Sequence, residues 1–542
     1  MTVTTSYPGV YIQELPSLTH SITPAPTSIA VFVGYTHPFL TPQANYLTAI
    51  QLFGTNDYQT SFGGFFSSPW LPDYVGQAVA EFFANGGPSC YVVGLPAVQY
   101  YNKGQPAGAS GAEVPVTPAF VDVQGGGGTG DIKFTALQPV GVPATAPATG
   151  TVGIPMQVAI SNVQPPTANT SASADIVVSY GARAETHRQV PINGITQALQ
   201  GSMLVEVSLS SPPPSEYPTS GSPFSLGYGT SPPELGWTII NPGDFAQVFE
   251  DYASLDKVPI FNLLATPGIS GFGVTSAAAA YCERKRAFLI VDTPSPSTAG
   301  WDANTLTTQL SAGTLSLSSA VPVSINAAVY YPWLSRTDPV TGVVSSAPAS
   351  GFVAGAYGQE DSARGVWKSP AGIETVLNGT TGVVPAGALT DQQQGVLNED
   401  ALNCLRQFPG IGTVIFGART TAGADANTAQ QQWKYIAVRR MALFIEQSLY
   451  ASLTWAAFEP NAQPLWDALT QDVNAFMLSL FRQGAFAGTT PSQSFVVQCD
   501  STTTTPTDIA AGRVNILVGF APLLPAEFVI VQIAQLAGQA QS

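Results

Sequence analysis

Few side chains in this sequence have the type and spacing that catalysis needs. The three histidines, His20, His37 and His187, are scattered along the chain and indicate neither a catalytic triad nor a metal cluster. Asp292 follows an apolar run, at the kind of strand end where catalytic carboxylates often lie, but Thr-Pro-Ser-Pro comes next and offers no nucleophile, base or metal partner. We therefore predict that the protein is not an enzyme and uses no metal or cofactor.

Two stretches have part of a phosphate-binding loop, and each lacks an essential residue. Residues 125–130 read Gly-Gly-Gly-Gly-Thr-Gly, but Asp131 follows where a Walker loop has lysine. Lys368 and Ser369 supply the Lys-Ser pair, but Trp367 stands where the glycine should be. We expect a flexible turn at the first stretch and no nucleotide at either.

The cysteines and the first residues of the chain both indicate in which cellular compartment the protein resides. Four cysteines without CxxC spacing favour buried, reduced thiols over a disulfide framework; they are Cys90, Cys282, Cys404 and Cys499. Residues 1–9 lack the basic and apolar regions of a signal peptide, and no apolar run reaches the ~20 residues of a membrane span. We expect a protein that is made and kept soluble.

Composition limits the partners. At 542 residues the chain is long enough for about three domains. Only 10% of the residues are charged, which suits a surface covered by neighbouring subunits. The net charge of -16 repels phosphate backbones, and no strong Lys/Arg cluster offsets it, so we expect no nucleic acid partner and no insertion into a membrane.

Outside one insert, apolar runs alternate between strand and helix periodicity, which indicates an α/β fold. The expected elements are strands at 28–34, 91–93, 259–264 and 287–291 and helices at 75–85, 244–255 and 276–286. Between them, residues 99–235 are rich in Pro, Gly, Ser and Thr and contain short alternating runs, which predicts an inserted all-β domain with long loops.

The C-terminal part begins with two apolar helices. Residues 431–458 contain no Gly or Pro and repeat apolar side chains at helical spacing. A break at Glu459-Pro460-Asn461 precedes a second such run from Leu465 to Phe481, which predicts a helical hairpin. Residues 494–500 then change to strand periodicity, so we expect the helices to pack on a sheet.

Several segments, taken in order, resemble the contractile tail sheath proteins of phages and phage tail-like injection systems. They are Ala328–Leu334, Ala349–Gly355, Arg364–Gly372, Trp433–Met441, Phe444–Glu446, Phe458–Asn461, Leu465–Trp466 and Ser494–Asp500. The resemblance covers nearly everything except the insert. It implies a multidomain α/β fold, with α/β sheath core domains, an inserted all-β outer domain and extended terminal strand arms.

Together with the composition, this resemblance gives an expected domain division. It comprises an N-terminal arm (1–26), a discontinuous α/β middle domain (27–98 and 236–345), the outer insert (99–235), a C-terminal sheath core domain facing an inner tube (346–521) and a C-terminal arm (522–542).

Both chain ends are extended and β-prone. Residues 7–14 could be an edge strand of their own domain, but the resemblance favours an arm that pairs with a neighbour's sheet. At the other end, Pro522 and Pro525 let the last strand reach away from the strand before it. A chain that gives strands and receives them makes heterologous contacts that propagate as rings or helices. The arm residues are Val10, Tyr11, Ile12, Glu14, Phe528, Val529, Ile530, Val531 and Ile533.

Three basic residues lie near the start of the first C-terminal helix: Lys434, Arg439 and Arg440. They could pair with nearby carboxylates such as Glu446 or cap a sheet edge. The resemblance favours a second role, in which some of them face the sheath lumen and hold the tube by weak, salt-sensitive attraction.

The function that the resemblance implies is mechanical. The chain would polymerise around an inner tube and contract from a metastable extended state, driving the tube through a target envelope. Expected partners are further copies, stacked as hexameric rings into a helical sheath, the tube protein, baseplate and terminal cap proteins, and an AAA+ ATPase encoded nearby. Assembly would take place in the bacterial cytoplasm, as part of a phage tail or of a released or cell-anchored injection particle.

Two other classes of protein stay open from the residues alone. A secreted β-rich adhesin or carbohydrate-binding protein would explain the Ser/Thr/Pro/Gly content, but it should carry a secretion signal and an exposed aromatic platform. A hydrolase with a Rossmann-like core would need a convergent polar site, which the sequence does not suggest.

Overall fold

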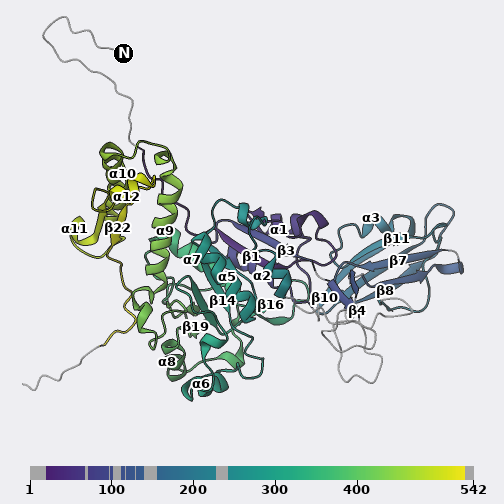
Figure 1. The fold of residues 1–542 in the computed structure, drawn as a ribbon. Coiled ribbons are helices and arrows are strands. Elements are labelled where there is room, and N and C mark those ends of the chain that lie inside the picture. The colour runs from purple at the N-terminus through teal and green to yellow at the C-terminus, as the bar shows by residue number, and fades with distance from the viewer. Residues whose placement is uncertain are drawn as a thin grey trace, which may run out of the picture. The chain divides into compact units, whose positions relative to one another are not determined.

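The computed structural model describes residues 20–67, 71–96, 98–101, 112–115, 118–128, 130–139, 156–227 and 242–530. It divides into two compact units (Figure 1). The terminal unit comprises Met1–Pro26, Gly365–Lys368 and Ala437–Ser542, and the central unit comprises Thr27–Arg364 and Ser369–Ile436.

The central unit is built on an eight-stranded sheet in the order β2-β3-β1-β13-β14-β15-β19-β20. Its six middle strands run parallel, and only the edge strands β2 and β20 are antiparallel to their neighbours. The strands are β1 (Ala30–Tyr35), β2 (Ile50–Leu52), β3 (Cys90–Leu95), β13 (Leu263–Ala265), β14 (Phe288–Asp292), β15 (Ala327–Tyr331), β19 (Leu402–Phe408) and β20 (Gly412–Ile415). Every residue of β1, β14 and β15 is buried, as the continuous apolar runs predict for strands covered on both faces.

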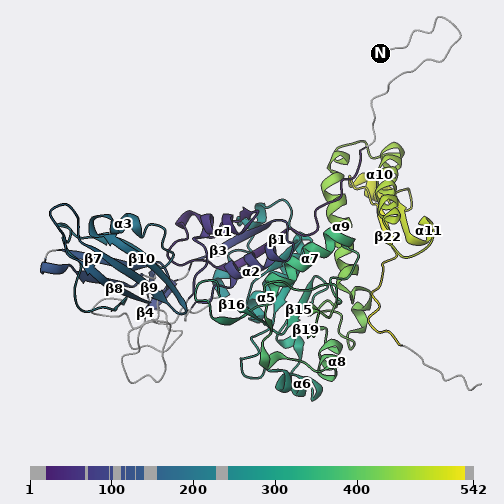
Figure 2. The same ribbon diagram turned by 180° about the vertical axis from the view of Figure 1, so that it is seen from behind.

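Helices cover both faces of this sheet, as the opposed views of Figure 1 and Figure 2 show. On one face, Val31 and Leu289 pack in one apolar core with side chains of α5, α6 and α8. On the other face, Phe32 meets Phe82 of α2 edge to face at 5.6 Å, and Phe288 meets Tyr357 of α7. The helices are α1 (Thr55–Phe62), α2 (Tyr74–Ala84), α4 (Pro242–Ala246), α5 (Phe272–Lys285), α6 (Ala303–Ser311), α7 (Ser350–Arg364) and α8 (Asp391–Glu399). The mixed α/β fold expected from the sequence is therefore confirmed.

The helix expected at 244–255 is wrong. Only α4 forms there, and turns follow until a 3₁₀ turn at Leu255–Lys257. Basic side chains from the end of α5 bond to carbonyls in and just after this segment: Arg284 donates to Phe249 O, and Lys285 donates to Asp256 O. Tertiary contacts here override local helix propensity.

Residues 98–227 hold strands β4 to β12. Two small antiparallel sheets, β10-β9-β8-β12 and β11-β7-β6, enclose one apolar core. A short helix, α3 (Ile195–Ala198), interrupts the strands. The strands are β4 (Val98–Tyr101), β5 (Ala112–Pro115), β6 (Phe120–Gln124), β7 (Asp131–Ala136), β8 (Met156–Gln164), β9 (Ser173–Tyr180), β10 (Arg183–Pro191), β11 (Val205–Leu209) and β12 (Phe224–Ser225). The outward placement of this insert stays a prediction, as does the five-part domain division.

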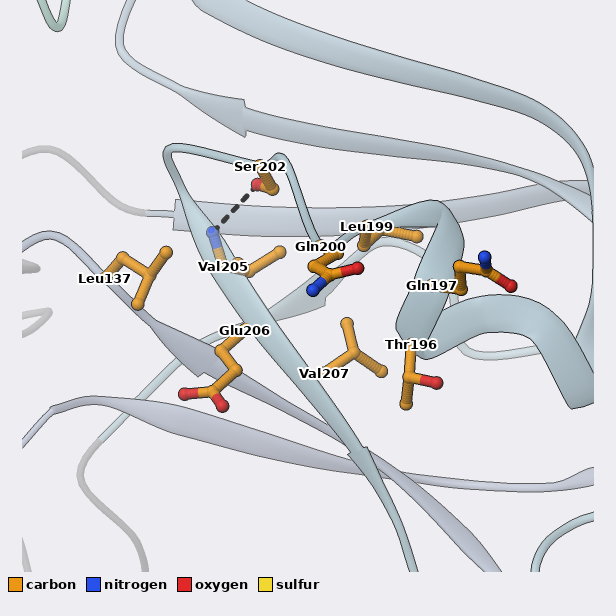
Figure 3. Close-up of a pocket in the computed structure, with 9 residues that line it drawn as sticks. All are labelled: Leu137, Thr196, Gln197, Leu199, Gln200, Ser202, Val205, Glu206 and Val207. Carbon is orange, nitrogen blue, oxygen red and sulfur yellow. Dashed lines mark hydrogen bonds between the residues drawn. The ribbon is translucent and has the colours of Figure 1, made fainter.

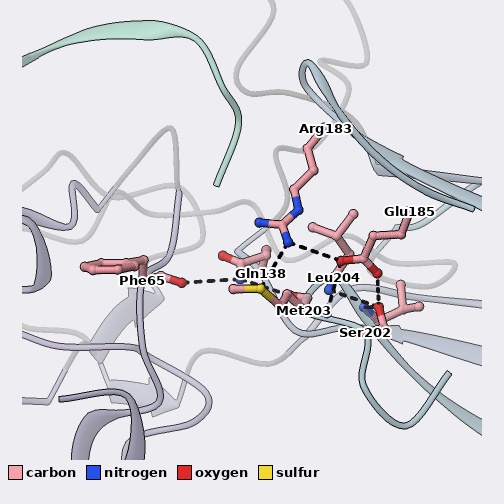
Figure 4. A network of polar contacts seen from close by, with 8 residues as sticks. Phe65, Gln138, Arg183, Glu185, Ser202, Met203 and Leu204 are labelled. Carbon is pink, nitrogen blue, oxygen red and sulfur yellow. Dashed lines mark hydrogen bonds and ion pairs between the residues drawn. The ribbon is translucent and has the colours of Figure 1, made fainter. Parts of the chain in front are cut away.

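A buried amide joins the insert to the core of the central unit (Figure 4). The Gln138 Oε1 accepts a hydrogen bond from Ser67 N at 3.2 Å. Its Nε2 donates to the carbonyls of Phe65 and Met203 at 3.4 and 3.2 Å. The Tyr180 hydroxyl adds a bond to Ser67 O at 2.8 Å. Because buried amide groups need partners, these bonds hold the insert against the segment that carries Phe65 and Ser67.

A small sheet, β17-β16-β18, lies beside the central unit's helices. Its strands are β16 (Leu334–Thr337), β17 (Val344–Ala347) and β18 (Gly382–Val383). Arg336, on β16, is buried and reaches Glu81 of α2.

The terminal unit contains the helical hairpin and a two-stranded sheet. Helices α9 (Ile436–Ser452) and α10 (Gln463–Arg482) share an apolar core with β21 (Phe495–Gln498) and β22 (Leu517–Phe520), which pair antiparallel. The prediction of two helices packed on a sheet is confirmed. Two short helices, α11 (Pro491–Ser494) and α12 (Pro506–Ala510), lie in the connections.

Helix α9 is shorter than the uninterrupted run 431–458 predicts. Its start is delayed because the backbone before it pairs with the segment after β20: Thr420 N donates to Lys434 O, and Ile436 N donates to Ala418 O. A backbone engaged in this way cannot also make helical bonds. At the other end, α9 gives way to a 3₁₀ turn at Thr454–Ala456.

Candidate functional site

The sheet β21-β22 has only two strands in the part of the chain that the structure describes. Its inner face, which carries Phe495 and Phe520, packs against the core of α9 and α10, yet these side chains are only half-buried. On the outer face, Val496 and Leu517 are 51% and 53% exposed. A sheet of two strands is marginal by itself, so β21-β22 is suited to accept a further strand.

The edge strand β10 of the insert differs in sequence. It carries Arg183, Glu185, His187 and Arg188, and charged side chains of this kind discourage pairing between sheet edges. The strands β21 and β22 read Phe-Val-Val-Gln and Leu-Val-Gly-Phe, without a charge. The strands β21 and β22 therefore lack the charged side chains that discourage strand addition.

The C-terminal segment is exposed and apolar, which suits a strand that such a sheet could accept. From Leu523 to Ile530 it forms no helix or strand. Phe528, Val529 and Ile530 are 74%, 81% and 84% exposed, which is unusual for three consecutive apolar residues. The other two arm residues at this end, Val531 and Ile533, lie outside the described residues, as do Val10, Tyr11, Ile12 and Glu14.

The described part of the N-terminal arm, residues 20–26, lies along α9. Thr23 N donates to Ser452 Oγ at 3.1 Å, and Ala25 N donates to Ser448 Oγ at 2.9 Å. Neither serine stands out in the sequence, because a hydroxyl on a helix gives no periodic signal that marks it as an anchor.

The three basic residues predicted to face a tube all make contacts within the chain. Lys434 Nζ lies 2.7 Å from Asp425 Oδ1, and Arg439 Nη1 lies 3.1 Å from Glu446 Oε1. Arg440 is only 3% exposed. Pairing with Glu446, the alternative role for these residues, is therefore present for Arg439, and a lumenal role stays a prediction.

Asp425 is a shared partner in this region. Arg419, a fully buried residue, lies 3.1 Å from the same carboxylate oxygen that Lys434 contacts. Burial opposes the charge of Asp425, but the hydrogen bonds from Lys434 and Arg419 outweigh it and lower the pKa of the carboxyl. Nothing in the sequence around Arg419 marks it as a partner of Asp425.

The residues considered for catalysis have structural surroundings. Asp292 is buried and accepts hydrogen bonds from Gly268 N and from the amide and hydroxyl of Ser350. Burial raises the pKa of Asp292 to about 6, although these bonds oppose the change. They place the carboxylate at the start of α7, where it interacts favourably with the helix dipole.

Histidines and cysteines are also accounted for. His37 follows β1, where burial lowers its pKa to about 4, and His187 lies on β10. No group of three His, Cys, Asp or Glu side chains comes together among the described residues. All four cysteines are free and buried, as predicted.

One cavity of about 500 Å³ lies in the insert, between α3 and β11 (Figure 3). Glu206 is the single ionisable side chain among the residues that line it. A lone carboxylate without a base, nucleophile or metal partner is not a catalytic arrangement. Separately, no helix of the described chain combines the length and apolar character of a membrane span.

Comparison with known protein families gives two matches. Residues 254–421 match the central domain of phage tail sheath proteins, and residues 428–535 match the phage tail sheath C-terminal domain. The two matches together cover about half of the chain.

Two relatives in sequence agree with these matches. A prophage major tail sheath protein of Pseudomonas aeruginosa strain UCBPP-PA14 is 24% identical over 36% of this chain and 48% of its own length. The tail sheath protein of Burkholderia phage BcepMu is 30% identical over 29% of this chain and 33% of its own length. The matched region thus spans half or less of each relative.

Solved structures are similar over nearly the whole chain. A chain in the contracted helical sheath of the anti-feeding prophage (AFP) has a TM-score of 0.56 with 22% identity, over 98% of this chain and all of its own. A chain in the contracted sheath complex of the extracellular contractile injection system PVC has a TM-score of 0.55 with 22% identity, over 98% of this chain and 99% of its own. These likenesses support the fold.

Proposed function

Because this chain belongs to the phage tail sheath family, we propose that it is the structural subunit of a contractile sheath. It polymerises as a helical array around an inner tube and contracts from a metastable extended state to drive the tube through a target envelope. The observation that carries this proposal is the uncharged two-stranded sheet β21-β22, with Val496 and Leu517 exposed on its outer face, together with the exposed apolar segment Phe528–Ile530.

Strand exchange connects the subunits in this proposal. The C-terminal arm of one subunit, and the N-terminal arm of another, add to the open edges of β21-β22. The arm of one copy and the sheet of the next are different surfaces, so the contact is heterologous and propagates instead of closing as a dimer. The low charge of the chain suits the extensive burial that such a lattice needs.

Contraction needs two packings of the same subunit. Rigid bodies rotate between an extended and a contracted lattice while the arms keep them connected. A bias on the order of a few kcal/mol per subunit, summed over a long helix, supplies the work without a nucleotide in this chain.

The proposed partners follow from this role. They are further copies, arranged as hexameric rings stacked into a helical sheath, the inner tube protein, and baseplate and terminal cap proteins, with an AAA+ ATPase encoded nearby. The likeness to chains in the AFP baseplate structure supports the baseplate contact. Assembly takes place in the bacterial cytoplasm, and the product is part of a phage tail or tail-like particle.

The insert and the basic residues have places in this proposal. Residues 99–235 face outward, away from the contractile lattice, and Lys434, Arg439 and Arg440 contribute a salt-sensitive attraction to the tube. The alternatives of an adhesin or a hydrolase gain no support from the family matches.

Truncation tests the assembly mechanism. The full chain, produced together with the tube and baseplate proteins encoded beside it, is compared by negative-stain microscopy with a variant that lacks residues 527–542. We expect long sheaths from the full chain and a folded, unpolymerised subunit from the truncation, because Phe528, Val529 and Ile530, in the described part of the deleted segment, are exposed. Long sheaths from the truncated chain would refute strand donation.

A matched variant separates the subunit that donates a strand from the subunit that receives it. Val496→Lys places a charge on the exposed outer face of β21, where it costs the folded subunit little but discourages edge pairing. We expect neither variant to form long sheaths. A mixture of the two variants should form at most short oligomers. A Val496→Lys subunit can donate its arm to a truncated subunit, but the truncated subunit has no arm to donate and the Val496→Lys subunit cannot receive one. A Val496→Lys variant that forms normal sheaths would place the receiving sheet elsewhere.

A further inference from the structure

Residues 20–26, which we call the arm root, run antiparallel to α9 inside the terminal unit. The amides of Thr23 and Ala25, two residues apart, bond to the hydroxyls of Ser452 and Ser448, four residues apart. Alternate residues of an extended chain advance ~6.6 Å, and one turn of helix advances ~5.4–6 Å, so the two repeats match. Pro24 and Pro26 keep the backbone extended. Neither has a backbone N–H, so neither adds a donor that would need a partner.

The surroundings of Ser448 favour its role as the acceptor of this hydrogen bond. Its side chain is fully buried, and its hydroxyl donates to Phe444 O within α9 at 2.7 Å. Because the hydroxyl proton is used inside the helix, the oxygen lone pairs are left to accept the Ala25 amide. The hydroxyl therefore holds the arm root without rotating away.

Apolar and aromatic contacts hold the same segment. Ile22 is buried in the core formed with Met441, Phe444 and Phe476. His20 stacks on Trp455, with ring centroids 4.2 Å apart and planes inclined by 18°. His20 also lies near the carboxyl of Asp472, whose pKa is raised by burial and lowered in part by this histidine.

We propose that residues 20–26 are a fixed root for the N-terminal arm, and that the Ser448/Ser452 track on α9 sets where the arm leaves its subunit and so which neighbour it reaches. This inference rests on the proposed function, since it concerns an arm that joins subunits. It adds that α9 is the element through which tension on the N-terminal arm enters the subunit. Ser448 and Ser452 are positioning residues in this role, and the strand-pairing residues lie elsewhere.

The first test examines the isolated subunit, without assembly. Thr23→Cys with Ser452→Cys puts a thiol on each of two residues whose amide nitrogen and hydroxyl oxygen now lie 3.1 Å apart. The four native cysteines are buried and free, so mild oxidation should act on the engineered pair. We expect an internal crosslink in the monomer, and none in the Thr23→Cys single variant. Failure of the double variant to crosslink would overturn the fixed root.

The second test examines assembly. Ser448→Ala with Ser452→Ala removes both acceptors while placing a better helix former in α9. Ser479→Ala on α10 is the matched control, because its hydroxyl bonds to Phe476 O of the same helix. We expect thermal unfolding of both variants to stay close to that of the parent, loss of long sheaths in the double variant, and normal sheaths in the control.

The two tests keep the inferences apart. Long sheaths from Ser448→Ala/Ser452→Ala would refute the root's role in assembly while leaving the sheath proposal intact. A parent chain that forms no sheath with its tube and baseplate partners would refute the sheath proposal, and the crosslink would still decide whether the root is fixed.

Discussion

Arg336 on β16 and Glu81 on α2 form an ion pair in the interior of the central unit, with Nη1 and Oε1 2.8 Å apart. Their side chains are 7% and 4% exposed, and 255 residues separate them in sequence. The pair ties the small sheet to a helix that covers the main sheet. The two partners differ in one respect, because a carboxylate can take up a proton and a guanidinium cannot lose one in a protein.

Removal of either partner should therefore have unequal effects. Glu81→Gln leaves the buried guanidinium of Arg336 without its carboxylate and should lower the free energy of unfolding by about 3–5 kcal/mol. Arg336→Met should cost less, because Glu81 can become neutral. Urea unfolding at about pH 9, where Glu81 is ionised because its folded pKa is about 8, measures both when it is followed by a probe in the central unit. A larger loss from Arg336→Met would contradict this account.

Buried carboxyls also make the central unit sensitive to pH. Burial raises the pKa of Asp73 to about 7 and of Glu81 to about 8. Since both folded-state values lie above the unfolded ones, the folded state binds protons more tightly, and this stability is present at low pH and lost as pH rises through the folded values. We expect the free energy of unfolding to fall from about pH 4.5, where the unfolded carboxyls ionise, to about pH 8, and to level off above the folded values.

The variant Asp73→Asn should flatten this pH dependence, because the amide does not titrate and its oxygen can still accept from Gly76 N. Glu374→Gln is the control, since that carboxyl is exposed and pairs with Arg364 at the surface. A slope that Asp73→Asn leaves unchanged would show that other groups carry the effect.

Local sequence patterns predicted the elements that are determined by residues close together in the chain. They failed where residues far apart in the sequence make the deciding contacts. The all-buried strand β1 and helix α10 are visible in the sequence as an apolar run and a helical repeat. The delayed start of α9 depends on backbone bonds to Ala418 and Thr420, which no helical periodicity contains.

Some residues of the candidate site can likewise be recognised in the sequence, and others cannot. The exposed apolar residues Phe528–Ile530 stand out in the sequence because such a run is unusual at a chain end. The anchors Ser448 and Ser452 do not, since a serine on a helix is unremarkable until the segment that it binds is known. Long-range pairing of this kind, like that of Arg336 with Glu81, appears only in three dimensions.

Deletion of the insert tests its outward placement. Replacing residues 99–235 by a short linker should preserve assembly and contraction, because exposed β-rich insertions tolerate removal. The deletion takes away Gln138, so the backbone groups of Phe65 and Ser67 lose partners, and we expect a lower melting temperature. Electron microscopy of sheaths is the measurement. A folded deletion variant that no longer assembles would place the insert inside the lattice.

The basic residues of the proposed tube contact allow a sharper test, because their partners are now known. Lys434→Glu with Arg439→Glu should give sheath-like polymers that assemble already contracted and without a tube, since the attraction to the tube is reversed. Higher salt should weaken tube retention by the parent in the same direction, because it screens exposed charges.

The ion pair of Arg439 with Glu446 supplies the decisive comparison. Exchanging the two, as Arg439→Glu with Glu446→Arg, restores the pair within the subunit but leaves a carboxylate at position 439. If the guanidinium at 439 contacts the tube, the exchanged variant should be as stable as the parent in thermal unfolding and still assemble empty. Extended, tube-filled particles from the exchanged variant would show that Arg439 acts only through its pairing with Glu446, and the tube contact would then have to be sought elsewhere in the C-terminal part of the chain.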